Sequence, residues 1–119
     1  MTTRYPTLRI TPLPQFGYTD PVAKIQRGEK TTTLRKTRRK GIVELVVGGS
    51  RYKPNRIGVF VEFYESTQAD PRRLSDEQWQ ADGIDGPDRK ANGLALIKHF
   101  YKEVPEVMYL NKFRVVEVK

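Results

Sequence analysis

Two neighbouring segments, GIVELVVGG (41–49) and RIGVFVEFYES (56–66), constrain the fold of this chain most strongly. Both are rich in β-branched and aromatic residues, which favour extended strands. In the second segment Val59, Val61 and Phe63 fall on one face, as the two-residue period of an extended chain requires. Only a short turn, which begins at the Gly-Gly pair, separates the segments. We therefore expect two antiparallel strands joined as a hairpin, with both faces partly covered.

Further strand patterns lie on both sides of this hairpin. The threonine-rich segment 31–34 is β-branched and extended, and the tail MYLNKFRVVEV (108–118) has a strand pattern that must pair back into the sheet. Residues 1–17 form an irregular, proline-rich N-terminal segment, in which residues 8–10 are expected as a short edge strand.

Three segments carry helical signals. A proline at the first helical position predicts a short helix over 21–27, and a Ser-to-Gln capping box at positions 75 and 78 predicts a second. In DRKANGLALIKHFYKE (88–103) apolar residues recur at spacings of three and four, which predicts an amphipathic third helix. The expected order is short strand, helix, three strands, two helices and final strand. It predicts a single α+β domain over residues 1–119, centred on a small, curved antiparallel sheet or barrel.

The composition excludes several classes of function. The chain has no cysteine, which excludes disulfides, thiolate–metal sites and a cysteine nucleophile. Its single histidine, His99, excludes a histidine-rich metal cage, and we expect no metal and no cofactor. No apolar run approaches the roughly 18 residues that span a bilayer and no signal-peptide block is present, so we expect a cytoplasmic protein without membrane contact. The formal net charge of +8 favours polyanionic partners.

The segment GEKTTT (28–33) is a first candidate site. Gly28 allows a sharp turn after the first helix, so that Lys30 stands at the entry of a strand. If Thr33 points into a concavity beside Lys30, the amine can activate the hydroxyl as a nucleophile, provided that burial or cationic neighbours lower the lysine pKa. The alternative is an ordinary exposed strand, rich in threonine, with a solvated lysine.

The following residues, RKTRRK (35–40), are a second candidate. If the strand at 31–34 continues through them, alternate residues face opposite sides of the sheet and form no single stripe of charge. As a hairpin loop they would instead neutralise phosphates and make binding dependent on salt, whereas as a solvated turn they would have no partner. Tyr52 in the next turn is available to stack on a base. The cationic residues assigned to nucleic-acid contacts by this pattern are Arg35, Lys36, Arg38, Arg39, Lys40, Lys53 and Arg56.

Four other polar or aromatic residues have a structural explanation beside a functional one. Asp82 and Asp85 flank a glycine turn that can present a carboxylate for acid-base chemistry, and Asp85 is expected to cap the third helix. His99 is expected at the border of the apolar stripe of that helix rather than in catalysis. Trp79 is expected as a packing anchor rather than as a stacking platform.

The sequence GEKTTTLR (28–35) resembles the G-x-K-x-x-[ET]-x-R signature of the ASCH family, which is related in fold to PUA domains. The helix just before the signature, the ADGIDG turn with the amphipathic helix after it, and the closing strand support the resemblance. It covers roughly residues 18–118.

This resemblance implies a PUA-like small β-barrel, with helices packed at its openings and a cleft along the signature strand. Members of the family are thought to bind RNA or nucleotides, and a small bacterial branch hydrolyses the amide of N4-acetylcytidine. The lysine and threonine of that branch correspond to Lys30 and Thr33, and its acidic residue, a glutamate, to Asp82. The signature arginine corresponds to Arg35, which can hold a carboxylate or phosphate in a bidentate grip.

Two functions follow as hypotheses. In the first, a monomeric module binds RNA or another single-stranded nucleic acid, with the cationic run on phosphates and with Lys30 and Thr33 reading a nucleotide. In the second, an amidohydrolase acts on N4-acetylcytidine or a related modified nucleoside: Thr33 attacks the acetyl carbonyl, Lys30 takes its proton, and Asp82 orients the lysine or a water. The cationic run and the proline-rich N-terminal segment are not features of the small amidohydrolases, so we favour the RNA-binding hypothesis.

Overall fold

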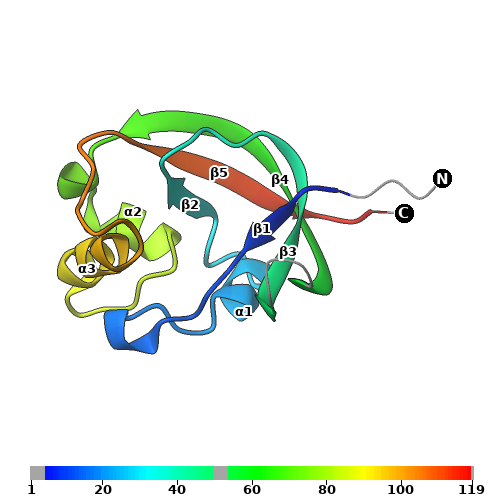
Figure 1. Cartoon of the computed structure of the whole chain (residues 1–119), viewed down its shortest axis with the longest axis horizontal. Coiled ribbons are helices and arrows are strands. Elements are labelled where there is room, and N and C mark those ends of the chain that lie inside the picture. Colours follow the sequence, from blue (N-terminus) through cyan, green and yellow to red (C-terminus); the bar gives the residue numbers. More distant parts are fainter. Residues whose placement is uncertain (1–4, 50–53, 119) are drawn as a thin grey trace.

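A computed structural model describes residues 5–49 and 54–118. In the described chain, strands and helices follow the order expected from the sequence (Figure 1). Their bounds are β1 (Thr7–Arg9), α1 (Pro21–Gln26), β2 (Thr32–Arg35), β3 (Gly41–Gly49), β4 (Pro54–Ala69), α2 (Asp76–Ala81), α3 (Arg89–Tyr101) and β5 (Met108–Val116), with short 3-10 turns η1 (Pro14–Phe16) and η2 (Pro71–Arg73).

The strands form one curled sheet of five strands in the order β1-β3-β4-β5-β2. The hairpin of β3 and β4 is antiparallel as predicted, and so are the pairs β4–β5 and β2–β5. β1 instead runs parallel to β3, so the sheet is mixed rather than wholly antiparallel. The edge strands β1 and β2 have no ladder between them in the described residues, which makes the sheet a curled half-barrel that is open between these two edges.

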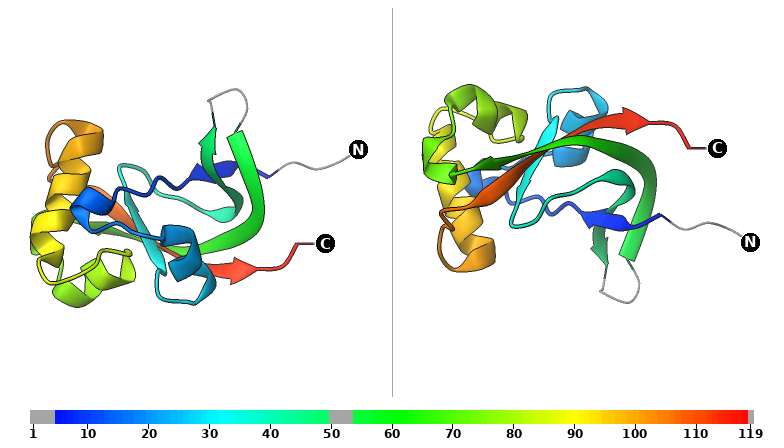
Figure 2. Two further views of the ribbon diagram at one scale, coloured as in Figure 1. Left: turned by 90° about the horizontal axis from the view of Figure 1, so that it is seen from below. Right: turned by 90° about the horizontal axis from the view of Figure 1, so that it is seen from above.

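The long strand β4 gives the sheet its curl. It pairs with β3 through its first half and with β5 from Phe60 to Ala69, and it bends sharply along its length (Figure 2). Its pairing with β5 shifts register between Phe63 and Glu65, as a β-bulge does, and bulges increase the local bend and twist of a strand. One strand can therefore join two differently oriented halves of the sheet.

Helices α2 and α3 lie together at one end of the curled sheet (Figure 1). The predicted capping box is present, because Ser75 Oγ accepts from the Gln78 amide and the Gln78 side chain accepts from the Ser75 amide. Trp79 is 1% exposed, as expected of a packing anchor, and α3 approaches it at Gly93. A Cβ atom at Gly93 would lie 2.4 Å from the indole ring, so only glycine permits this approach.

The structure differs from the sequence-based expectation in two connections. β2 does not neighbour β3 but pairs with β5, so residues 36–40 cross the sheet to reach β3 instead of forming a strand extension or a hairpin loop. Asp85 does not cap α3, whose N-cap position is Asp88, and it binds Thr19 and Lys24 instead. Within the described ranges, no helix has the length and apolar character to cross a membrane.

Candidate functional site

A hollow of about 320 Å³ opens between the free edges of β1 and β2 and is walled on one side by α3. Apolar side chains such as Leu34 and Ile97 form part of its lining, and Tyr18 and Trp79 add aromatic surface. Its polar lining residues are Arg9, Thr11, Lys30, Thr33, Arg35 and Asp82. A mostly apolar cleft of this size with a few converging polar groups is typical of small-ligand sites.

Lys30 is buried at the base of this hollow and is 2% exposed. The chain turns at Gly28, whose φ of +78° suits glycine, and so carries Lys30 from α1 to the start of β2. Its Nζ donates to the main-chain oxygens of Thr32 and Asp82, each at 2.6 Å, and lies 5.3 Å from the centre of the Tyr18 ring. The lysine is therefore held by oxygens and an aromatic face rather than by water.

The second polar group is Asp82, at the end of α2. Its Oδ1 accepts from the Thr32 hydroxyl at 3.1 Å and lies 3.9 Å from Lys30 Nζ. Gly83 follows with a φ of +96°, and a Cβ there would lie 3.0 Å from Lys30 Cδ. The glycine turn thus lets the lysine stem pass beside the carboxylate.

Burial shifts the pKa values of these groups in opposite directions. Loss of solvent lowers the pKa of Lys30 to about 8, although the negative charge of Asp82 opposes the shift. The same loss of solvent raises the pKa of Asp82, against the effect of Lys30. Burial also raises the pKa of Tyr18. Perturbed ionisable groups in a cleft are characteristic of functional sites, although structural ion pairs produce them as well.

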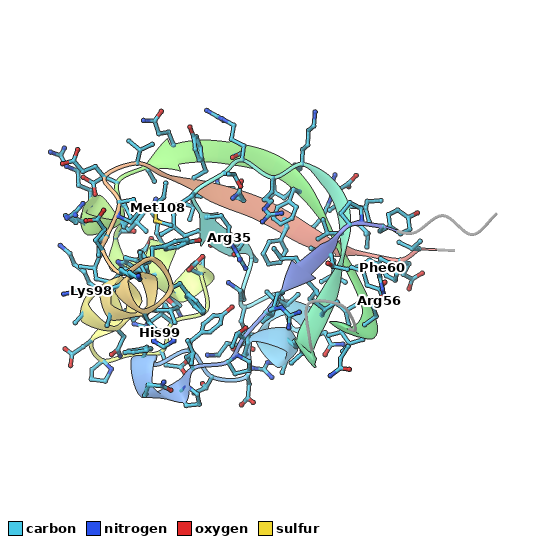
Figure 3. All side chains as sticks on the ribbon, in the orientation of Figure 1. Arg35, Arg56, Phe60, Lys98, His99 and Met108 are labelled. Carbon is cyan, nitrogen blue, oxygen red and sulfur yellow. The ribbon has the colours of Figure 1, made fainter. Side chains whose placement is uncertain are left out.

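Thr33 and Arg35 lie on the β2 side of the hollow. The hydroxyl of Thr33 accepts from Arg35 Nε at 3.0 Å, and Arg35 Nη2 donates to the main-chain oxygen of Arg9 at 3.1 Å. Arg35 thereby spans the opening between the two edge strands, inside the curl of the sheet (Figure 3). Among the described residues no hydrogen bond joins Lys30 Nζ to Thr33 Oγ1, and the hydroxyl that contacts Asp82 belongs to Thr32.

The cationic run leaves this site and crosses β5 toward β4. Lys36 is exposed and is not itself a lining residue, but its Nζ lies 4.8 Å from the centre of the ring of Tyr101, which lines the hollow. Arg38 lies farther along, over the Tyr109 ring, and donates to the main-chain oxygen of Ser66 at 2.8 Å. Arg39 is half-buried, and Lys40 is exposed.

The crossing is fixed by Asn111, a fully buried side chain of β5 that the sequence analysis did not single out. Its Oδ1 accepts from the Arg39 amide at 2.9 Å and from the Ser66 hydroxyl at 2.7 Å, and its Nδ2 donates to the main-chain oxygen of Thr37 at 3.2 Å. The backbone of the cationic run is therefore held in one conformation by these hydrogen bonds. No sequence signal distinguishes this asparagine from an exposed one in a strand.

The other described candidates, Arg56 and His99, are not among the residues that line the hollow. Arg56 pairs with Glu44 at 2.8 Å and lies at the end of the sheet opposite α3 (Figure 3). Tyr52 and Lys53 lie outside the described residues. His99 is exposed, as its expected border position suggests, and packs between Phe16 and Phe100. In the described part of the chain, no group of three acidic or histidine side chains is arranged to hold a metal ion.

Comparison with known proteins identifies the fold. No protein-family model matches the sequence, and no curated protein shows a significant match. The high-resolution crystal structure of an ASCH domain from Lactobacillus crispatus JV V101 matches with a TM-score of 0.61 and 18% identity over 95% of this chain and 80% of that one. The chain has an ASCH-like fold. In this ASCH-like fold the predicted signature occupies β2 and the turn before it.

A second structure supports the same fold. The crystal structure of a protein from Enterococcus faecalis V583, described by the family model DUF984, matches with a TM-score of 0.56 and 13% identity over 78% of this chain. The chain spans 64% of the length of that protein. At these identities both likenesses concern the fold alone. They confirm the α+β, PUA-like architecture that the GEKTTTLR segment led us to expect.

Proposed function

We propose that the hollow between β1 and β2 binds one nucleotide of a single-stranded RNA. The observation that carries the proposal is that the cationic run begins beside the hollow, because Lys36 Nζ lies over the ring of Tyr101, a residue that lines it. A volume of about 320 Å³ is at the lower end of the range for small-ligand pockets and suits a single nucleoside.

One residue of the lining holds a buried polar atom that has no partner in the described part of the chain. The indole Nε1 of Trp79 is buried and has no acceptor among the described residues, although a buried indole N–H usually finds one. Because this atom is closed to solvent, a bound base could accept from it only after neighbouring side chains move. The rings of Tyr18 and Trp79 are 7% and 1% exposed, so they give the hollow an apolar floor rather than open faces for stacking.

The cations around the mouth suit the phosphates. Arg9 and Arg35 line the hollow, and Lys36, Arg38 and Lys40 follow along the crossing. Phosphate contacts of this kind give affinity and register without reading sequence. The net charge of +8 favours the same partner.

Binding can be measured directly, because Trp79 is the only tryptophan of the chain and lines the hollow. We expect 5′-mononucleotides and short RNA strands to change its fluorescence, and RNA affinity to fall steeply as salt increases. The double variant Arg38→Ala and Lys40→Ala is expected to weaken RNA binding and to reduce its salt dependence, whereas the double variant Lys90→Ala and Lys98→Ala, at exposed positions of α3, serves as the charge-matched control. Equal effects of both variants, or no fluorescence response to any nucleotide, would contradict the proposal.

A second candidate function is hydrolysis of the amide of N4-acetylcytidine, and the lowered pKa of Lys30 favours it. A pKa of about 8 leaves roughly a tenth of the lysine neutral at pH 7, which suits a general base. Lys30 would take the hydroxyl proton of Thr33 while the Thr33 oxygen attacks the acetyl carbonyl. Lys30 would then return that proton to the departing amine of cytidine as the C–N bond breaks. Water would then release acetate from the threonine ester, and Asp82 would hold the lysine in place.

The geometry ranks this candidate second. Lys30 Nζ is engaged by two main-chain oxygens, and the Thr33 hydroxyl accepts from Arg35, so Lys30 would have to turn toward Thr33 before reacting. Release of cytidine and acetate from N4-acetylcytidine by the wild-type chain, lost in both Lys30→Met and Thr33→Val, would favour the enzyme. Binding of N4-acetylcytidine without its hydrolysis would favour the nucleotide-binding function proposed first.

A further inference from the structure

The face of α3 that lines the hollow continues onto the exposed surface of the protein. Gly93 and Ile97 are buried against it, and Phe100, one turn farther along, lines its mouth with 52% of its surface exposed. Residues spaced by three and four lie on one helix face, so the same stripe leads from the interior to the surface. A ligand longer than the hollow can leave along this stripe.

Phe100 belongs to a short row of rings. His99 lies 5.3 Å from it, edge to face, and Phe16 of η1 lies 5.5 Å from His99 on the other side. These contacts hold the Phe100 ring at the mouth while leaving half of it uncovered. An exposed phenylalanine alone would be unremarkable, but this one adjoins a cleft with perturbed ionisable groups.

The positive charges near Phe100 indicate which kind of ligand would cover its ring. Lys36 stands over Tyr101 in the next position of α3, and Arg9 and Arg35 line the same opening. The acidic residue of the lining, Asp82, is buried at the base. An uncovered aromatic ring beside several cations matches an aromatic base attached to a phosphate, and stacked bases with flanking cations are the usual means of holding single strands.

We propose that Phe100 stacks the base of the nucleotide adjacent to the one in the hollow and that Lys36 contacts the phosphate between them, so that the ligand is a single strand rather than a free nucleoside. This inference rests on the proposed nucleotide site. It deepens that proposal by stating that the binding surface spans at least two nucleotides.

The test compares mononucleotides with strands. The four 5′-mononucleotides and short homopolymeric RNA strands of A, C and U are titrated against the wild-type chain and followed by Trp79 fluorescence. We expect the best strand to bind more tightly than its own mononucleotide, and Phe100→Ala to weaken strand binding by roughly tenfold while lowering mononucleotide affinity far less. Tyr64→Ala is the matched control, because Tyr64 is 55% exposed on β4 and lies outside the lining of the hollow.

Two more variants identify the interaction. Phe100→Tyr, which keeps a ring without adding a second tryptophan, is expected to maintain strand binding, and Phe100→Leu, which keeps an apolar side chain without a ring, is expected to resemble Phe100→Ala. Lys36→Ala is expected to reduce the salt dependence of strand binding by about one phosphate contact.

The outcomes separate the two proposals. Mononucleotide binding with no gain from a longer strand, or equal losses in Phe100→Ala and Tyr64→Ala, would overturn the stacking role and leave the nucleotide site standing. Full strand binding by Phe100→Leu would also overturn it and would identify a generic apolar contact. Failure of the wild-type chain to bind either kind of probe would overturn both proposals.

Discussion

The ammonium group of Lys30 lies 2.6 Å from the main-chain oxygen of Asp82 and 3.9 Å from its carboxylate, and the two residues are only 2% and 7% exposed. This contact joins the entry of β2 to the end of α2, across 52 residues of sequence. It also places two ionisable groups where water cannot stabilise either charge, so each group depends on the other. The pH dependence of folding should therefore report this pair.

We predict that unfolding free energy rises with pH between about 8 and 10 because of Lys30. The folded pKa is about 8 and the ordinary value is 10.5, so in this window the unfolded chain binds more protons and stability increases with pH. The raised pKa of Tyr18 acts in the opposite sense only above its ordinary value of 10.0, because the unfolded chain then loses a proton that the folded chain keeps. Urea unfolding at several pH values is the measurement.

Lys30→Met provides the comparison, since methionine keeps most of the length of the side chain without the charge. Over the same window the wild-type chain is expected to gain on the order of 1–2 kcal/mol relative to this variant. Parallel stability profiles for the two chains would show that Lys30 does not titrate in this range.

A second prediction concerns the anchor of the cationic run. Asn111→Ala is expected to lower the unfolding free energy by about 3 kcal/mol, because it leaves the Arg39 amide and the Thr37 carbonyl without their side-chain partner at a fully buried position. Ser66→Ala removes only one bond to the same side chain and is expected to cost about 1 kcal/mol. Equal costs in chemical denaturation would mean that Asn111 does not organise the crossing.

Much of the fold follows from local pattern. The hairpin of β3 and β4, the capping box at Ser75 and the amphipathic helix α3 were all predictable, because side-chain period and capping act over a few residues. The hollow could also be anticipated around Lys30 and Thr33, since both belong to the short segment that resembles the ASCH signature.

The features that could not be predicted from the sequence depend on contacts between segments that are distant in the chain. The parallel pairing of β1 with β3 and the placement of β2 beside β5 are decided by the curl of the whole sheet. The same holds for the hydroxyl that meets Asp82, which belongs to Thr32 although Thr33 was expected to act with it. The twist of a short edge strand decides which neighbour reaches a carboxylate 50 residues away.

A third prediction tests the close approach of α3 to α2. Gly93→Ala is expected to destabilise the chain by roughly 1–3 kcal/mol, because its Cβ would lie 2.4 Å from the buried Trp79 ring and this overlap outweighs the better helix propensity of alanine. At the exposed Ala91, the reverse change to glycine is expected to cost about 1 kcal/mol through propensity alone. Stabilisation by Gly93→Ala in urea unfolding, with an unchanged Trp79 emission maximum, would refute the steric argument.

A fourth prediction concerns Arg35 as the link across the open edges of the sheet. Lysine at this position keeps the charge but cannot reach both the Thr33 hydroxyl and the Arg9 carbonyl, since it lacks the planar fork of the guanidinium. Arg35→Lys is therefore expected to cost about 1–2 kcal/mol and to speed amide hydrogen exchange at Ile10, which donates to Val46 just after β1. Arg38→Lys, at an exposed site with a single main-chain acceptor, is the matched control and should change stability by less than about 0.5 kcal/mol. If exchange at Ile10 is the same in both variants, the two edge strands are held together by something other than Arg35.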